Sequence, residues 1–498
     1  MMEKTTGKNI PRIRIQKITM DNFKGVEHGV IEFNCFKDHT RNDLKADILG
    51  LYGQNGSGKT TLIDALLLLQ DMVWTYGNYA ESYHVYDVVN RNADHAHLQY
   101  SFLFENEDDT YYSVDYDVSL KSQNALLGDI DETFEYEVQI PYVYDEILTL
   151  SGHFNGKDIR RISIMDTRSE EEAFLPKSWQ KRFFPVDTEK QLEAFKENKS
   201  FSKEIGRSCI FSFWDSKPKE NSSCADIIVF LQLFITEYLY VSSSRIGRYE
   251  SLSINVEKDD LYYTGTQKVG ALGYRFLNQD STFHVSNLFV RDDLDGWLSS
   301  INTVLPHIIP GMTLKCIDLG ELPDSNIHTR QMKIFTTRNG IDIPIREEAE
   351  GIQRVIANIS LYLSAFANSY VTVLIDELDA GVYEFLLGEL LSVFQEYGVG
   401  QLIFTSHNLR PLEVLDHSFI CFTTSNPANR YLRLKNVRNG NNLRDLYLRQ
   451  IVLGGQTEEL YRGARHGQLA AAFMKAGEAF ADVSIGAFGN GELDNAQE

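Results

Sequence analysis

Residues 53–61 constrain the fold of this chain most, because their sequence, GQNGSGKTT, satisfies the pattern G-x-x-x-x-G-K-[ST]. Residues 46–52 form a short apolar run that predicts a strand, and residues 61–69 predict a buried helix. Glycines let backbone N–H groups turn inward around an anion, and a helix N-terminus adds partial positive charge at the same point. The order of strand, loop and helix therefore predicts a polyphosphate-binding loop.

The side chains of this loop predict separate roles. Lys59 is expected to reach the β- and γ-phosphates of a nucleotide, and the Thr60 hydroxyl is expected to ligate Mg²⁺. The other candidate nucleotide-binding residues in the loop are Asn55, Gly56, Gly58 and Thr61. The alternative is a chance glycine-rich turn. It does not explain why the complete motif stands between a predicted strand and a predicted helix.

Length and charge limit the class of protein. A chain of 498 residues predicts two or three domains, because single cores stop growing at about 250–300 residues. Lys and Arg number 48 against 70 Asp and Glu, a net charge of −22, so the surface as a whole repels nucleic acid and any such contact needs a local patch. Five scattered cysteines predict reduced, buried thiols. No apolar run reaches the roughly 18 residues of a membrane span, so we expect a cytoplasmic protein without a membrane partner.

A second chemical feature lies far downstream, at residues 371–377. This apolar, β-branched run ends in Asp376 and Glu377, which predicts a buried parallel strand with two carboxylates at its carboxyl end. Ligands bind at that edge of open α/β sheets. Asp376 is expected to hold Mg²⁺, directly or through water, and Glu377 is expected to polarise an attacking water.

In this order the motifs resemble the heads of ABC-class ATPases of the SMC, RecF and OLD type. The resemblance implies that Lys24, in an Asn-Phe-Lys-Gly turn between two strands, lies near the nucleotide; the alternative is a plain surface lysine. His407, just after a predicted strand at 401–405, would be the switch histidine, or else a polar loop residue. Gly351 would be the signature glycine, although Ala349 stands where the family has Ser; the alternative is an acidic helix start.

The resemblance implies an α/β fold: a P-loop ABC-type ATPase head with an antiparallel β subdomain and a large α+β insertion between Walker A (the phosphate loop) and Walker B (the acidic strand). Sustained heptads are absent, so long coiled-coil arms are not expected. The expected domains are 1–110, with Walker A; 111–309, the β subdomain plus a helical projection; 310–450, with signature, Walker B and switch histidine; and 451–498, a C-terminal helix and acidic tail.

Basic residues add two further hypotheses. Arg245 is a candidate for holding phosphate or bracing a dimer, or it pins a loop. A basic segment in this acidic chain could face nucleic acid or an acidic partner, or could be a solvated face. It consists of Arg430, Arg433, Lys435, Arg438, Arg444 and Arg449.

In ABC-class heads the signature of one protomer completes the site of another. The resemblance therefore implies a homodimer or higher even oligomer with ATP and Mg²⁺ between the heads.

Fewer than about 80 residues follow the last predicted sheet strand, too few for the nuclease domain of OLD-type relatives. The chain is thus similar to ATPase subunits of bacterial anti-phage systems of the PARIS or Septu type. That similarity implies slow, regulatory hydrolysis, a separate nuclease or toxin as effector, and a phage protein or nucleic acid as trigger. The alternatives are a DNA-repair or chromosome-type ATPase of the RecF or SMC class, and a transporter ATP-binding subunit.

Overall fold

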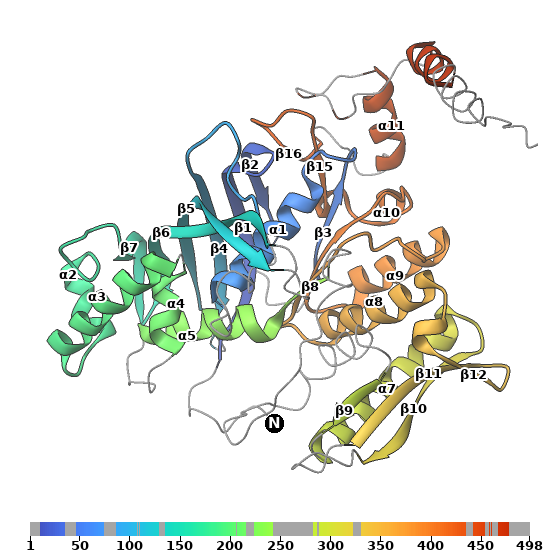
Figure 1. The fold of residues 1–498 in the computed structure, drawn as a ribbon, viewed down its shortest axis with the longest axis horizontal. Helices are drawn as coiled ribbons and strands as arrows, with labels where there is room; N and C mark the ends of the chain where they lie inside the picture. Colours follow the sequence, from blue (N-terminus) through green and yellow to red (C-terminus); the bar gives the residue numbers. More distant parts are fainter. Residues whose placement is uncertain are drawn as a thin grey trace, which may run out of the picture.

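A computed structural model describes the chain in segments that together form three β-sheets (Figure 1). The described residues are 10–34, 46–73, 86–106, 108, 110–128, 135–205, 207–215, 224–242, 282–285, 288–321, 330–434, 442–453, 458, 460 and 467–477. The expectations for Arg245, Lys435, Arg438 and the acidic tail lie outside these residues.

Sheet B is the parallel sheet that carries the two predicted phosphate-site strands. Its order is β16-β15-β3-β14-β13-β8, and every neighbouring pair except β15 with β16 is parallel. The strands are β3 (Asp47–Tyr52), β8 (Leu239–Ser242), β13 (Thr372–Ile375), β14 (Gln401–Thr405), β15 (Ile420–Thr423) and β16 (Tyr431–Leu432). Because β3 and β13 both pair with β14, the chain segments that follow these three strands meet at one sheet edge.

Sheet A is antiparallel, with the order β2-β1-β4-β5-β6-β7. Its strands are β1 (Arg12–Phe23), β2 (Val26–Glu32), β4 (Ala96–Glu105), β5 (Tyr111–Gly128), β6 (Glu135–Phe154) and β7 (Lys157–Asp166). The antiparallel subdomain expected from alternating residues is therefore present. Strands β5 and β6 are much longer than the short strands predicted there, and they pair well beyond the end of β4.

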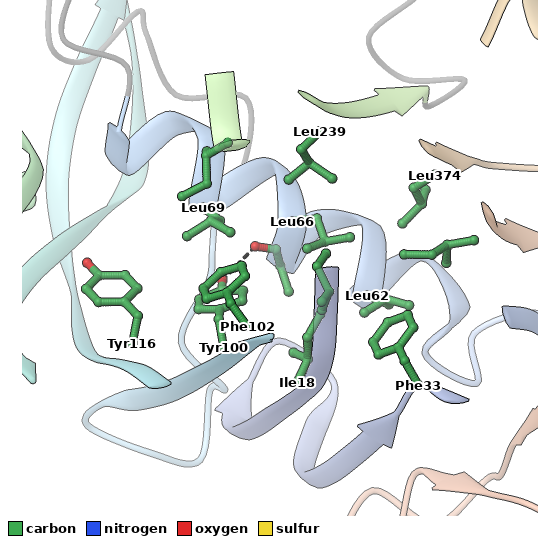
Figure 2. Close-up of a cluster of buried hydrophobic side chains, with 14 of the residues drawn as sticks. Ile18, Phe33, Leu62, Leu66, Leu69, Tyr100, Phe102, Tyr116, Leu239 and Leu374 are labelled. Atoms are coloured by element: carbon green, nitrogen blue, oxygen red, sulfur yellow. Dashed lines mark hydrogen bonds between the residues drawn. The ribbon is translucent and has the colours of Figure 1, made fainter. Parts of the chain in front are cut away.

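Helix α1 (Lys59–Val73) lies between sheets A and B. Its residues are almost all buried, as expected for a helix covered on every side. Figure 2 shows Leu62, Leu66 and Leu69 between Tyr100 of sheet A and Leu374 of sheet B. The Tyr100 hydroxyl also donates to Ala65 O at 2.6 Å. The helix that follows the phosphate loop is thus the core of the main unit.

Short helices cover one end of sheet A. They are α2 (Lys177–Phe183), α3 (Thr188–Ile205), α4 (Cys209–Asp215) and α5 (Ala225–Leu233), followed by a π-helical turn, η2 (Phe234–Tyr238). Their aromatic side chains pack together, with ring centroids of Phe195 and Phe213 5.0 Å apart. Buried Glu146 of β6 accepts from the Tyr116 hydroxyl and from Cys209 N at 2.8 and 2.7 Å, which fixes α4 to the sheet. The helical projection expected within residues 111–309 stays a prediction.

A second hydrophobic core lies under sheet C, drawn in yellow in Figure 1. Sheet C contains β9 (Thr282–Val285), β10 (Met312–Glu321), β11 (Arg330–Arg338) and β12 (Ile341–Pro344), and it packs against α7 (Leu288–Ile308). A 3-10 turn, η4 (Ile345–Glu347), leads into α8 (Glu350–Ala367). Val355 and Ile356 of α8 belong to the second core, whereas Leu361 and Ala365 belong to the main core. Helix α8 therefore joins the two cores.

The remaining elements follow the Walker B strand. They are α9 (Glu384–Tyr397), α10 (Pro411–Val414), η5 (His417–Phe419), α11 (Leu443–Leu453) and a helix at 467–477. Arg444 of α11 pairs with Glu413 of α10 at 2.8 Å. In the part of the chain that is described, no helix is both long and apolar enough to cross a membrane.

Candidate functional site

The phosphate loop has the backbone conformation that its glycines permit. Gly56 and Gly58 have φ values of +77° and +97°, in the left-handed region that glycine adopts without strain. A Cβ on Gly53 would collide with the Thr423 hydroxyl of β15. That hydroxyl instead contacts the Ser57 hydroxyl, so strand β15 supports the loop from behind. Asn55 and Gly56 form the exposed tip of the loop.

Lys59 lies within the curve of the loop. Its Nζ donates to Gly53 O at 2.7 Å and to Gln54 O at 3.2 Å. Burial lowers the pKa of Lys59, and the nearby carboxylates of Asp376, Glu377 and Asp379 act in the opposite direction. Walker A and Walker B therefore lie close together here, although they are far apart in the sequence. Thr60 is half-buried and Thr61 is buried at the start of α1.

Thr405, at the end of β14, holds the Asp376 carboxylate and the backbone of Glu377. Its hydroxyl donates to Asp376 Oδ1 at 2.6 Å, and Glu377 N donates to the same hydroxyl at 2.8 Å. Glu377 has a φ of +52°, which is rare outside glycine and marks a conformation that the surrounding contacts must impose. The structure thus fixes the direction in which the Glu377 side chain leaves the strand.

His407 and the following residue are tied to the loop after Walker B. The backbone N–H groups of His407 and Asn408 donate to Asp379 Oδ2 at 3.2 and 3.1 Å. The His407 side chain itself is exposed. Asp379 Oδ1 is buried and has no hydrogen-bond partner within the described residues. The sequence signal for this position is a carboxylate inside Asp-Glu-Leu-Asp-Ala-Gly, just after the Walker B strand.

Gly351, the signature-like glycine, packs against Gly381 in the loop after Walker B. A Cβ on Gly381 would lie 2.8 Å from Gly351 Cα, so only glycine permits this approach. Ala349 precedes α8 and caps it through its carbonyl, which accepts from Ile352 N at 2.8 Å. No side-chain cap is made by Ala349. The signature-like turn and the Walker B loop therefore lie side by side.

Arg354, one turn into α8, reaches the same loop. Its Nη1 is 3.5 Å from Glu377 Oε2, and its Nη2 bonds to Glu350 Oε1 at 2.9 Å. Both partners are partly exposed, so the pairs stabilise the fold only slightly. Their effect is positional, because they hold the Glu377 carboxylate toward the start of α8. Sequence reasoning missed Arg354, since nothing local shows which loop a helical arginine will contact.

One family model matches the part of the chain that contains the phosphate loop. It is described as an AAA domain and matches residues 17–223. Together with the parallel strand order around that loop, this match decides the fold class. The fold is that of a P-loop ATPase. It has the antiparallel β subdomain and the α+β insertion that we expected.

Solved structures of low identity are also similar to the chain. The Smc head domain with an extended coiled coil from Pyrococcus furiosus, bound to the C-terminal domain of ScpA, is 14% identical; the match covers 85% of this chain and 96% of that chain, with a TM-score of 0.37. The SMC head domain from Thermotoga maritima is 12% identical, with coverages of 85% and 99% and a TM-score of 0.31. A search of curated proteins gave no match.

The residues at this ATPase-type site suit Mg²⁺. Magnesium in phosphate-transfer sites is held by one or two protein oxygens together with phosphate oxygens and water, not by an all-protein cage. The Thr60 hydroxyl and the Asp376 carboxylate supply such oxygens, and Thr405 orients the second. Within the described residues no group of three or more His, Cys, Asp or Glu side chains could hold a metal by itself.

Lys24 lies next to the second turn of α1. Its Nζ bonds to Asp64 Oδ2 at 2.6 Å, and the two side chains are 20% and 7% exposed. Lys24 N donates to Val88 O at 2.8 Å, and its carbonyl accepts from the Asn90 amide at 2.7 Å. Lys24 is therefore no plain surface lysine. It fixes the turn at 22–25 to the helix that follows the phosphate loop.

The described residues of the basic segment near the C-terminus differ in exposure, from buried Arg430 to exposed Arg449. Arg430 is buried, and Arg433 donates to the backbone carbonyls of Ser418, Ile420 and Glu32. Arg444 pairs with Glu413. For Arg430 the expectations of a surface for nucleic acid or an acidic partner, and of a solvated face, are both wrong, and Arg433 is only partly exposed. Both guanidinium groups instead donate to backbone carbonyls of segments from sheets A and B, which need such donors.

Proposed function

We propose that this chain binds ATP with Mg²⁺ and hydrolyses it slowly, as a regulatory ATPase. The observation that carries the proposal is the convergence of Lys59, Asp376 and Glu377 at one edge of sheet B. Lys59 and the loop N–H groups would hold the phosphates, and Thr60 and Asp376 would hold Mg²⁺, which neutralises phosphate charge. Glu377, fixed by Thr405 and Arg354, would orient the attacking water and accept its proton.

We further propose that two heads associate around ATP into a homodimer or a higher even oligomer. The contact of Gly351 with Gly381 supports this, because it places the signature-like turn beside the Walker B loop on one surface. In the resemblance that surface faces the nucleotide of a second copy, with His407 near the γ-phosphate. Lys24 would act at the same nucleotide through the turn that it fixes.

We also propose that the ATPase works as the sensor and scaffold of an anti-phage system and controls a separate nuclease or toxin. This step rests on the resemblance. The competing function is a DNA-repair or chromosome-type ATPase of the RecF or SMC class. The charge of −22, the burial of Arg430 and the hydrogen bonds of Arg433 to backbone carbonyls favour the first function, since neither arginine is then free to contact DNA.

The first test measures nucleotide binding and phosphate release in three variants. Lys59→Ala is expected to lose ATP binding. Glu377→Gln is expected to bind ATP normally but to hydrolyse it about 10²–10⁴ times more slowly, because the general base is lost. The control, Lys190→Ala on exposed α3, should behave like the wild type. Equal hydrolysis rates of Glu377→Gln and the wild type would show that Glu377 is not the general base.

A second test separates the two functions. DNA added to the wild type should leave the hydrolysis rate unchanged at low and at high salt, whereas a RecF-type or SMC-type ATPase would be stimulated in a strongly salt-dependent way. Cells that carry the chain with the neighbouring genes of its own genome should resist phage. That resistance should disappear with Lys59→Ala. Stimulation by DNA without phage resistance would favour the competing function.

A further inference from the structure

Arg430 is a buried cation directly behind the phosphate loop. The residue is 7% exposed, and a Cβ on Gly58 would lie 3.0 Å from Arg430 Cγ. Its guanidinium donates through Nη1 to Thr424 O at 2.8 Å and through Nη2 to Gly25 O. One side chain therefore contacts the phosphate loop and the turn at 22–25, which also carries Lys24.

Among the described residues no carboxylate is paired directly with Arg430, although Glu27 acts on it as a more distant opposite charge. The buried Nε of Arg430 also has no hydrogen-bond partner within the described part of the chain. A buried guanidinium without a directly paired counter-ion is unfavourable, because more distant charges offset its desolvation only in part. Burial accordingly lowers the pKa of Arg430. Such a residue is tolerated where an anion binds close by, and the phosphate loop is the neighbouring anion site.

Tyr431, the next residue, supports the same point of the loop. Its hydroxyl donates to Gly58 O at 2.7 Å, and its ring covers Gly29, where a Cβ would lie 2.7 Å from Cδ2. Tyr431 belongs to β16, which pairs with β15, and β15 supports Ser57 through Thr423. The loop is thus held at two successive residues, Ser57 and Gly58, from one edge of sheet B.

We propose that Arg430, assisted by Tyr431, is a positioning residue of the nucleotide site. It holds the phosphate loop against the turn at 22–25 and supplies a positive charge that the phosphates of ATP neutralise. The inference rests on the proposed ATP binding and goes beyond it, because it assigns part of the affinity to a residue outside the Walker motifs. Removing the guanidinium should weaken nucleotide binding in addition to any effect on stability.

The test compares Arg430→Met with Arg433→Met. Arg433 is a matched control, since it also joins the two sheets through backbone carbonyls but contacts Ser418 and Glu32, not the phosphate loop. Binding of Mg-ATP is measured by titration calorimetry and unfolding by thermal denaturation. Arg430→Met should weaken ATP binding about tenfold, and Tyr431→Phe about threefold, as expected for lost hydrogen bonds to the loop and its turn. Arg433→Met should lower the unfolding temperature while ATP affinity stays that of the wild type.

Arg430→Lys separates charge from geometry, because it keeps the cation with fewer fixed donors. It should recover part of the affinity that Arg430→Met loses. If Arg430→Met does not fold, Arg430→Lys and Tyr431→Phe still decide the question. Wild-type affinity in these variants, or an equal loss of affinity in Arg433→Met, would show that Arg430 acts only on the fold. Absence of ATP binding in the wild type would instead overturn the proposed function itself.

Discussion

At Gly381 the structure leaves no room for a side chain. The residue has a φ of +80°, and a Cβ would lie 2.5 Å from Gly351 O. Gly381→Ala should therefore destabilise the protein by about 2–4 kcal/mol, from backbone strain together with the clash. It should also lower ATP hydrolysis, because the Walker B loop and the start of α8 must separate. Urea denaturation and phosphate release measure the two effects.

Gly296 is the control for this substitution. It lies on the exposed side of α7, and a Cβ there would meet nothing within 4 Å. Gly296→Ala should stabilise the protein by about 0.5–1 kcal/mol, because alanine loses less backbone entropy in a helix. Comparable stability of Gly381→Ala and Gly296→Ala would mean that the contact between Gly351 and Gly381 is not maintained in solution.

At the scale of elements, a charged cluster links three strands of sheet A, and we expect it to make the stability of the protein depend on pH. His97 of β4 lies 3.4 Å from Asp117 of β5 and 3.7 Å from Asp21 of β1, and Asp21 also bonds to His28. The hydrogen bond with Asp117 raises the pKa of His97 above its ordinary 6.5, although partial burial acts against it. The stability from this contact is complete below about pH 6.5 and is lost as the pH rises through the folded-state pKa.

The unfolding free energy, measured from pH 5.5 to 8.5, should therefore fall as His97 loses its proton, by less than about 1 kcal/mol because the cluster is partly exposed. Asp117→Asn and His97→Gln should each flatten this dependence, and 1 M salt should reduce it in the wild type. An unchanged slope in His97→Gln would show that His97 is not the source of the dependence.

Local patterns in the sequence were enough for the elements that carry the phosphate site. Alternating or continuous apolar runs predicted β14 at 401–405 and the strand and helix around the phosphate loop, because burial repeats with the period of each element. The pairing of Arg354 with Glu377, and the burial of Arg430, could not be predicted. Both depend on which distant segment of the chain packs against the arginine, and local sequence patterns do not reveal this.

At the scale of the whole molecule, α8 connects the signature-like turn to both hydrophobic cores. Val355 and Ile356 pack in the second core with Trp297 of α7, which donates to Ser360 at 3.1 Å, and Leu361 and Ala365 pack in the main core. A movement of the sheet C unit would therefore shift Gly351 relative to Glu377. The outer surface beside this joint is where a second head would bind under the proposed function.

Two exposed aromatic side chains lie on that surface, just after the Walker B loop. Tyr383 is 71% exposed and Phe385 is 57% exposed, with ring centroids 5.9 Å apart, and the Arg410 guanidinium lies 5.0 Å from the Phe385 ring. Aromatic residues already held in place are typical anchors of interfaces. In a Glu377→Gln background, Tyr383→Ser with Phe385→Ser should weaken association in Mg-ATP at least about tenfold, measured by sedimentation velocity.

The same helix provides the matched comparison, because α9 also exposes Val393 and Tyr397 at its far end, at 43% and 63%. Val393→Ser with Tyr397→Ser removes similar apolar area from the same helix, so general effects on α9 or on solubility should be equal in the two double variants. Only the pair beside the Walker B loop should change association, and neither pair should change the ATP affinity of a single head. If the far pair weakens association equally, or the near pair has no effect, the heads do not meet at this surface and the composite site must be abandoned.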